Sequence, residues 1–326
     1  MKQEQVSEAV LEARAALDAV FGEVAKQIVG QRGMVRAMVM ALLARGHVLL
    51  EGVPGLAKTR AVKTLAGVLD LGFRRIQFTP DLLPSDLTGN LVYVANTGEF
   101  RPRMGPIFSN IILADEINRA PAKVQSALLE AMEERQVTIG EQTYPLEEPF
   151  FVLATQNPIE QEGTYPLPEA QLDRFLLKVL LDYPSHDEEL RIVRLVSNDD
   201  ELSVRKVLNA AGVDRLRSVA RRVAVDQRIE EYIVNLVGLS RSRDRERTEH
   251  ARFVEYGASP RASVYLHRCA RINAMFEGRE YVIPEDVKEV ALPVLRHRIV
   301  LSYEADSENV AADQVVRSIL NQVKVP

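Results

Sequence analysis

Hydrophobic and polar residues follow two different periods along the chain, and these periods predict where helices and strands lie. Up to about residue 45, apolar positions such as Val10, Leu17 and Val20 recur at helical spacing, and Val29-Gly30 interrupts the pattern. We therefore expect two helices in this stretch. Beyond it, short apolar runs alternate with helical patterns, at residues 47–51, 74–78, 110–114, 150–154 and 175–181.

Short apolar runs of this kind are typical of strands that are buried on both faces. Their alternation with helical patterns predicts an α/β fold, in which a mainly parallel sheet is covered by helices. The pattern ends at Tyr183-Pro184-Ser185, where Ser185 and Glu188 form a capping-box sequence for a new helix. The pattern after this point predicts only helices, at residues 226–241, 260–276 and 284–299.

The length of 326 residues suits two domains rather than one. We expect an α/β core with N-terminal helices over residues 1–183 and a smaller all-helical domain over residues 184–326.

Charge and composition indicate which partners and which cellular compartment to expect. The formal charge is −5, from 41 basic and 46 acidic residues, and no segment is a sustained basic run, so nucleic acid is not the default partner. Cys269 is the only cysteine, which excludes an intrachain disulfide and fits a reducing compartment. The N-terminus lacks the apolar core of a signal peptide, and no apolar run has the length of a membrane span. We expect a cytoplasmic protein.

A loop suited to phosphate binding comes after the first apolar run. The residues are Gly52-Val53-Pro54-Gly55-Leu56-Ala57-Lys58-Thr59, followed by Arg60 and a helical pattern. In this strand, loop and helix context, backbone N–H groups and the positive end of the helix face phosphates. Lys58 would neutralise β- and γ-phosphate charge, and the Thr59 hydroxyl would bind Mg²⁺. We therefore expect the nucleotide to be bound by Arg60 and by every residue of this loop except Val53.

One position departs from the general pattern, because Ala57 stands where glycine usually precedes the lysine. A methyl group is tolerable there if the residue lies in the right-handed helical region. The alternative for the whole loop is an ordinary tight turn from strand to helix.

Two adjacent acids, Asp115 and Glu116, end another apolar run. In a nucleotide site Asp115 would hold the Mg²⁺ shell while Glu116 polarises the attacking water. Buried strands also end in acids that merely return to solvent or cap the next helix. The loop at Lys58 makes the catalytic interpretation the stronger one.

Three further polar residues occupy suggestive places. Asn157 comes after an apolar strand, where it could hydrogen-bond a γ-phosphate or orient water, or belong to an Asn-Pro turn. Arg174 precedes a strand, and an ion pair with Asp173 or Glu169 is its alternative role. Arg261 lies in the first turn of a helix capped by Ser259, where the helix dipole disfavours a cation unless an anion is nearby. Its alternative is a long side chain that reaches water at small cost.

These five elements, in this order and context, resemble those of the AAA+ ATPases and, within them, the MoxR family. The resemblance runs from about Val29 to the last helices. Its most specific features are Gly-Val-Pro-Gly-Leu-Ala-Lys-Thr, Ala-Asp-Glu-Ile-Asn-Arg-Ala, Ala-Thr-Gln-Asn-Pro and Glu-Ala-Gln-Leu-Asp-Arg-Phe. The family's loop also carries the alanine found here at position 57.

The resemblance implies a P-loop AAA+ core with a helical lid, and an ATPase that uses ATP and Mg²⁺. It assigns Lys58 and Thr59 to the Walker A loop, Asp115 and Glu116 to Walker B, and Asn157 to the first sensor. It makes Arg174 an arginine finger and Arg261 the second sensor. It also implies a homo-oligomeric, hexameric ring that remodels or activates partner proteins, including proteins with von Willebrand A-type domains.

Two hairpins are predicted from strand pairs that flank short turns. Residues 91–94 and 99–101 flank 95–98, and residues 137–140 and 143–146 flank Glu141-Gln142. Tyr93 and Phe100 flank the turn of the first hairpin. In MoxR-like rings such hairpins face the pore or the client, whereas a surface ribbon with only a packing role is the alternative.

Other functions remain open at this point. One is a motor or enzyme-complex subunit, as in magnesium-chelatase-like or nucleic-acid-linked AAA+ proteins, and a nucleic-acid motor would show turnover stimulated by nucleic acid. Another is a binding module in which ATP merely cements an oligomer. Glu116 argues against the binding module, because ATP that only stabilises an oligomer requires no catalytic acid.

Overall fold

The computed structural model describes residues 3–53, 55–158, 163–197, 203–242, 248 and 250–326. Contacts divide the chain into two units. We call Asp18–Leu167 with Val179–Asp214 the sheet unit, and Met1–Leu17, Pro168–Lys178 and Arg215–Pro326 the helical unit. Within the described residues, no helix is long and apolar enough to cross a membrane.

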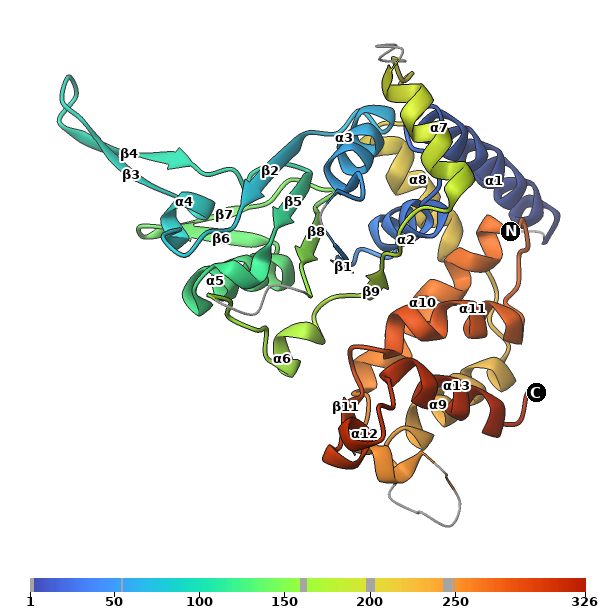
Figure 1. Cartoon of the computed structure of the whole chain (residues 1–326). Coiled ribbons are helices and arrows are strands. Elements are labelled where there is room, and N and C mark those ends of the chain that lie inside the picture. Colours follow the sequence, from blue (N-terminus) through green and yellow to red (C-terminus); the bar gives the residue numbers. More distant parts are fainter. Residues whose placement is uncertain (1–2, 54, 159–162, 198–202, 243–247, 249) are drawn as a thin grey trace. The chain divides into compact units, whose positions relative to one another are not determined.

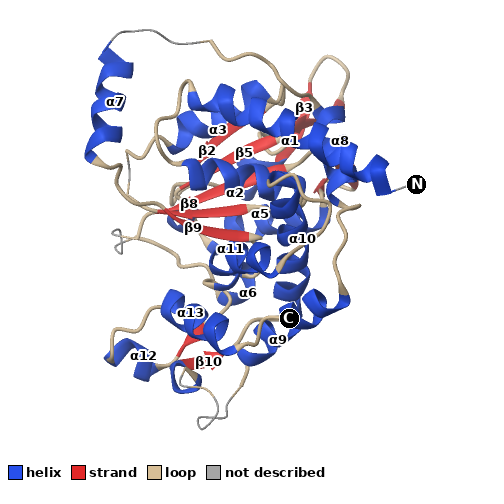
Figure 2. Cartoon of the chain, turned by 90° about the vertical axis from the view of Figure 1, so that its right-hand side faces the viewer, coloured by secondary structure: helices blue, strands red, loops and turns tan. Residues whose placement is uncertain are grey.

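A five-stranded sheet contains all five predicted strands, in the order β2-β5-β8-β1-β9 (Figures 1 and 2). The strands are β1 Val48–Glu51, β2 Phe73–Gln77, β5 Ile111–Asp115, β8 Phe151–Gln156 and β9 Leu177–Leu180. The pairs β2·β5, β5·β8 and β8·β1 are parallel. Residues 111–114 and 151–154 are completely buried, which explains why these strands are apolar without alternation. The predicted α/β class is confirmed.

Helices pack along the sheet through their apolar stripes. α2 contacts β1 and β8, and α3 contacts β2 and β5. The N-terminal residues form two helices, as predicted, with the break near Gly30, whose φ is +67°. The helices in this part of the sequence are α1 Gln3–Ala25, α2 Arg32–Leu43, α3 Lys58–Val68, α4 Pro84–Thr88, the 3₁₀ helix η1 Ile117–Arg119, α5 Ala122–Glu134 and α6 Glu169–Leu172.

Both predicted hairpins are present and stand apart from the five-stranded sheet. The first consists of β3 Gly89–Val94 and β4 Glu99–Met104, and it extends as a two-stranded arm (Figure 1). Gly98 in its turn has a φ of +68°, a conformation that glycine adopts without steric cost. The second consists of β6 Gln136–Ile139 and β7 Gln142–Pro145.

The later part of the chain is built mainly of helices, as predicted. They are α7 His186–Ser197, α8 Ala210–Ala220, α9 Gln227–Leu239, the 3₁₀ helix η2 Ala251–Phe253, α10 Pro260–Phe276, α11 Pro284–Leu295, α12 Tyr303–Ser307 and α13 Ala312–Gln322. The predicted capping box of α7 forms, since Ser185 N–H donates to Glu188 Oε2 at 2.9 Å. A short antiparallel pair, β10 Val254–Tyr256 with β11 Val300–Leu301, was not predicted, because strands this short show no period.

The division into units does not coincide with the predicted boundary after residue 183. The chain from Val179 to Asp214 stays with the sheet unit. Val207 and Leu208 N–H donate to the Val68 carbonyl at 2.8 and 3.3 Å, at the end of α3. Arg205 binds the buried Glu23 carboxylate, with Nη2 to Oε1 at 2.9 Å. These long-range bonds attach a segment that its helical pattern alone assigned to the second domain.

Candidate active site

The loop after β1 runs directly into α3, which begins at Lys58. Gly52 is needed for a close approach, because a Cβ there would lie 2.8 Å from Leu181 Cβ. Gly55 has a φ of +88°. Pro54, one of the predicted binding residues, lies outside the described residues.

Ala57 corrects one expectation from the sequence. Its φ and ψ are 54° and 21°, so it lies in the left-handed region and not in the right-handed helical region that would make its methyl group tolerable. A non-glycine residue there costs on the order of 1 kcal/mol.

Lys58 closes the loop that precedes it. Its Nζ donates a hydrogen bond to the Gly52 carbonyl at 2.7 Å. Burial lowers the pKa of Lys58, and the charges of Asp115 and Glu116 oppose that shift. The ammonium group is therefore bound to the loop backbone and lies within electrostatic reach of the two acids.

Thr155 on β8 orders both acids at the end of β5. Its hydroxyl donates to Asp115 Oδ1 at 2.7 Å, and the Glu116 backbone N–H donates to the Thr155 oxygen at 2.8 Å. Thr155 is 1% exposed. Glu116 itself has a φ of 57° and a ψ of 51°, a left-handed conformation that ends the strand abruptly. Such strained residues are enriched at active sites.

Two residues of β2 join the side chains of the acids. Arg75 donates to Asp115 Oδ2 from Nε at 3.0 Å and from Nη2 at 2.6 Å, and its Nη2 also donates to Gln77 Oε1 at 2.8 Å. Gln77 Nε2 in turn donates to Glu116 Oε2 at 2.7 Å. A continuous chain therefore runs from Asp115 through Arg75 and Gln77 to Glu116.

Sequence reasoning missed Arg75, Gln77 and Thr155. The signal for the first two was their spacing, because residues two apart on a strand share a face. In the parallel register Gln77 lies beside Asp115. The side chains of Arg75 and Gln77 are therefore on the same face of the sheet as that of Asp115. Thr155 had no signal of its own, since a buried threonine in a strand is common.

A pocket of about 440 Å³ lies over these groups, within the range of small-molecule sites. Its lining includes most of the predicted residues and two of the three that were missed, Arg75 and Thr155. The lining residues are Gly55, Leu56, Ala57, Lys58, Thr59, Arg60, Arg75, Asp115, Glu116, Thr155, Gln156 and Asn157. Asn157 directly follows β8 and is 8% exposed.

The donor groups in this pocket suit Mg²⁺ carried by a nucleotide. Thr59 offers a hydroxyl and Asp115 a carboxylate, both oxygen ligands. Among the described residues, no group of three or more His, Cys, Asp or Glu side chains could hold a metal ion. Mg²⁺ does not need such a cage, because it binds through one or two protein oxygens plus phosphates.

Arg174 and Arg261 belong to the helical unit. An anion lies beside Arg261 in the first turn of α10 and offsets the unfavourable helix dipole there. It is Asp173, whose Oδ2 is 3.5 Å from Arg261 Nη1. Ser259 occupies the predicted N-cap position, but its hydroxyl donates to Asp173 Oδ2 at 3.0 Å instead of capping the helix. Contacts of Arg174 and Arg261 with ATP stay predictions.

Family models match both parts of the chain. A model of the ATPase family associated with various cellular activities (AAA) matches residues 47–177, and a model of the AAA lid domain matches residues 246–319. The first match includes the loop, both acids, Asn157 and Arg174. The second includes Arg261.

Two curated relatives and one solved structure are similar over nearly the whole chain. Chaperone MoxR1 of Mycobacterium tuberculosis is 47% identical over 95% of this chain and 82% of its own length. Protein MoxR of Methylorubrum extorquens is 31% identical over 93% of each chain. The crystal structure of a candidate ATPase from Cytophaga hutchinsonii, 49% identical, has a TM-score of 0.93 and covers 100% of this chain and 99% of its own.

Proposed function

The chain belongs to the MoxR family of AAA ATPases, and we propose that the pocket at the ends of β1, β5 and β8 is where it hydrolyses ATP. It is an ATPase with a chaperone-like role. Among the relatives that span most of the chain are a chaperone and a MoxR protein, which supports that role over the magnesium-chelatase-like, nucleic-acid-linked and ATP-cemented alternatives.

One observation carries the assignment of the site. Lys58, Asp115, Glu116 and Asn157 come from three separate segments, and they line one pocket. In the proposed reaction Lys58 neutralises phosphate charge, and Glu116 accepts a hydrogen bond from the attacking water and turns its oxygen toward the γ-phosphate. Asn157 donates an amide hydrogen bond to the γ-phosphate or to that water.

The remaining loop residues hold the nucleotide. The N–H groups of Gly55, Leu56 and Ala57, together with the N-terminal end of α3 at Lys58, provide donors for the phosphates. Thr59 and Asp115 would hold Mg²⁺, which would neutralise charge on the β- and γ-phosphate oxygens. Arg60, which lines the same pocket, supplies a further cation.

Two arginines extend the proposal beyond this pocket. Arg261 acts as the second sensor of its own nucleotide, and Arg174 acts as an arginine finger in the site of a neighbouring subunit. The supporting fact is that the family match includes both residues. The proposed assembly is a ring of six copies, and its location is the cytoplasm, where ATP is supplied.

The β3-β4 hairpin is the proposed contact with the client. Leu91, Val92, Tyr93 and Phe100 are between 40% and 64% exposed. Exposed aromatic side chains on a projecting arm suit the gripping of a protein partner. Proteins with von Willebrand A-type domains are the proposed class of partner.

The site assignment is tested by separating ATP binding from turnover. Lys58→Ala should abolish ATP binding, because a partly buried cation and its hydrogen bonds to phosphate are lost. Glu116→Gln should bind ATP but hydrolyse it on the order of 100-fold more slowly, because the carboxylate that polarises the attacking water is gone. Binding is measured with a fluorescent ATP analogue and turnover by phosphate release.

Lys63→Ala is the matched control, because Lys63 lies exposed on the same helix, α3. It should bind and hydrolyse ATP as the wild type does. Wild-type turnover by Glu116→Gln would show that another group activates the water. ATP binding by Lys58→Ala with unchanged affinity would remove the pocket from the mechanism.

A further inference from the structure

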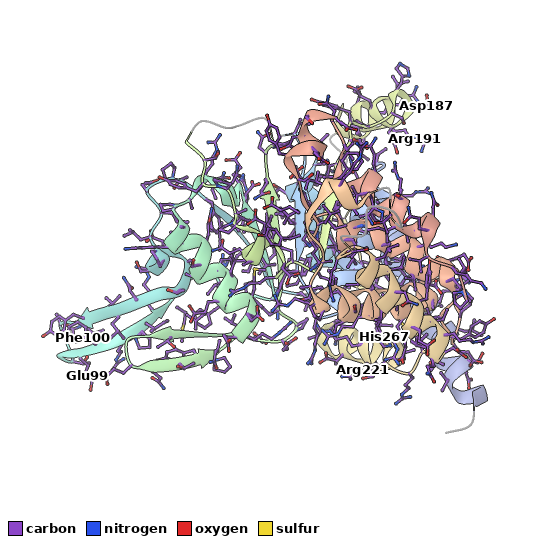
Figure 3. The ribbon with its side chains drawn as sticks, turned by 90° about the horizontal axis from the view of Figure 1, so that it is seen from below. Glu99, Phe100, Asp187, Arg191, Arg221 and His267 are labelled. Carbon is purple, nitrogen blue, oxygen red and sulfur yellow. The ribbon has the colours of Figure 1, made fainter. Side chains whose placement is uncertain are left out.

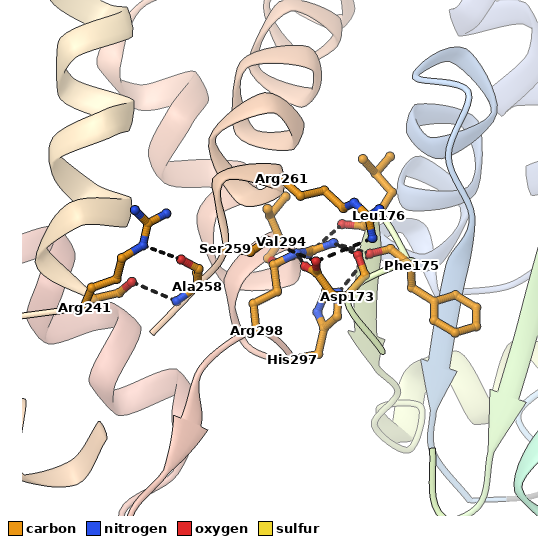
Figure 4. A network of polar contacts seen from close by, with 11 residues as sticks. Asp173, Phe175, Leu176, Arg241, Ala258, Ser259, Arg261, Val294, His297 and Arg298 are labelled. Atoms are coloured by element: carbon orange, nitrogen blue, oxygen red, sulfur yellow. Dashed lines mark hydrogen bonds and ion pairs between the residues drawn. The ribbon is translucent and has the colours of Figure 1, made fainter. Parts of the chain in front are cut away.

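Arg298, a residue that plays no part in the proposed chemistry, binds the chain on both sides of Arg174 (Figure 4). Its Nε donates to Asp173 Oδ1 at 2.8 Å, and its Nη2 donates to the Asp173 carbonyl at 3.0 Å. Further bonds reach the carbonyls of Phe175, Leu176 and Val294, the Leu176 bond measuring 3.3 Å. The guanidinium also lies 4.9 Å from the centre of the Tyr265 ring.

This guanidinium is a desolvated charge, since the Arg298 side chain is 1% exposed. A buried cation is tolerated only when it is paired and its N–H groups are satisfied. Here the partners are one carboxylate and several carbonyls, and most belong to residues 173–176. If the segment that carries Arg174 moved away from Arg298, the buried guanidinium would lose its counter-ion and most of its hydrogen-bond acceptors.

His297 adds a second attachment to the same segment. Its Nε2 lies 3.0 Å from the Phe175 carbonyl oxygen. A carbonyl only accepts, so Nε2 carries the hydrogen and donates it. Burial holds the pKa of His297 well below its usual value, so the ring is neutral.

The contact pattern agrees with these bonds. Residues Pro168–Lys178 belong to the helical unit, although the chain on either side, Asp18–Leu167 and Val179–Asp214, belongs to the sheet unit. Arg174 is therefore carried by the helical unit. Any reorientation of that unit moves Arg174 with it.

Asp173 connects this anchor to the proposed second sensor. Its Oδ1 accepts from Arg298, while its Oδ2 accepts from Ser259 and pairs with Arg261 at 3.5 Å. One carboxylate thus joins the residue beside Arg174, the buried anchor and the first turn of α10. The Arg261 pair is long and partly exposed, so it adds little to the hold of the buried Arg298.

We propose that Asp173 and Arg298 are positioning residues for Arg174, which fix it on the helical unit so that it reaches the neighbouring subunit's site in the correct geometry. This inference rests on the proposed role of Arg174 as a finger in that site. A displacement of about 1 Å at such a group lowers kcat by on the order of 100-fold.

The test is complementation in mixed assemblies. Asp173→Asn keeps the shape of the side chain and removes its charge. Alone, it should bind the fluorescent ATP analogue as the wild type does, with kcat lowered on the order of 100-fold. Mixed with Lys58→Ala, it should recover turnover, because an intact pocket then meets an intact finger. Mixed with Arg174→Ala, it should recover nothing, because both partners then lack a working finger.

The opposite pattern, recovery with Arg174→Ala but not with Lys58→Ala, would show that Asp173 acts in its own subunit's pocket and would overturn the proposal. Recovery with neither in assembled mixtures, or full turnover by Asp173→Asn alone, would also overturn it. The mixture of Lys58→Ala with Arg174→Ala is the reference. If that mixture stays inactive, the finger role of Arg174 itself fails, which is a distinct result.

Two further variants separate positioning from stability. Arg298→Lys keeps the charge but not the forked geometry, and it should fall in the same complementation class as Asp173→Asn. It also decides the matter if Asp173→Asn does not fold. Asp286→Asn breaks another buried pair of the helical unit, with Arg279 at 2.6 Å. This control should melt at a lower temperature while keeping the wild-type kcat per folded subunit.

Discussion

At the scale of single residues, the side chains that bind Asp115 and Glu116 affect how these acids can bind a metal ion. Asp115 Oδ2 is already engaged by Arg75, whose side chain is 48% exposed in the pocket. A metal ion approaching this oxygen meets a competing cation. Through Gln77 the same arginine is linked to Glu116.

We therefore predict that Arg75→Gln lowers the Mg²⁺ concentration needed for half-maximal binding of the ATP analogue by about two- to fivefold, the equivalent of a partly exposed ion pair worth ~0.5–1 kcal/mol. A Mg²⁺ titration of binding measures this shift. Arg74→Gln is the control, because Arg74 is exposed on the other face of β2. A higher Mg²⁺ requirement in Arg75→Gln would mean that the arginine assists the metal rather than competes with it.

His47 should make the sheet unit sensitive to acid. Its Nδ1 accepts from Val152 N–H at 3.0 Å, and burial lowers its pKa to about 3. Between pH 6.5 and pH 3 the unfolded chain binds a proton that the folded chain does not, so stability falls as pH falls, by ~1.4 kcal/mol per pH unit. Stability from this group is complete above pH 6.5.

Urea unfolding of the wild type and of His47→Gln at pH 7 and pH 5 measures the effect. The wild type should lose ~2 kcal/mol more than the variant over this interval. His186→Gln should behave as the wild type does, because His186 is 85% exposed. Equal losses in wild type and His47→Gln would show that His47 does not control this acid sensitivity.

At the scale of elements, the β3-β4 hairpin exposes two aromatic side chains. Tyr93 and Phe100 are directly opposite in the antiparallel register, with ring centroids 5.4 Å apart. They are 57% and 64% exposed, and Phe100 points outward near the end of the arm (Figure 3). The alternative in which both rings pack on the sheet does not fit these exposures.

We predict that replacing Tyr93 and Phe100 together by serine removes client-stimulated turnover and leaves basal ATPase activity and assembly nearly intact. A cross-strand pair contributes only ~0.2–1 kcal/mol, so the melting temperature should shift little. ATPase assays and melting curves are compared with Tyr303→Ser, an 86% exposed aromatic in the helical unit. A destabilised double variant with unchanged client coupling would assign the rings to packing.

At the scale of the whole molecule, a finger that acts in a neighbour's site requires an assembly. We predict that Glu116→Gln with ATP and Mg²⁺ forms a species of six copies, because bound ATP gives Arg174 of each subunit an anion to engage. Native mass spectrometry measures the number of copies. Lys58→Ala should assemble less under the same conditions. A wild-type monomer that hydrolyses ATP at full rate would contradict both the ring and the finger.

The sequence by itself determined the elements and the main chemical groups. Short runs between helical patterns predicted all five strands of the sheet. For β1, β5 and β8 the signature is burial on both faces, whereas most residues of β2 are exposed. The residues at Lys58, Asp115 and Asn157 could be placed in one site, because the carboxyl ends of parallel strands meet at one edge. Local pattern and strand direction were sufficient for that much.

Only the tertiary structure decided which side chains hold these groups and which unit carries them. Arg298 binds Asp173 across 125 positions of sequence, and Arg75 binds Asp115 across 40. Ala57 also adopts a backbone conformation that its residue type does not favour. These outcomes depend on contacts between distant segments, and on buried charges that must find partners, so periodicity and motif spacing carry no record of them.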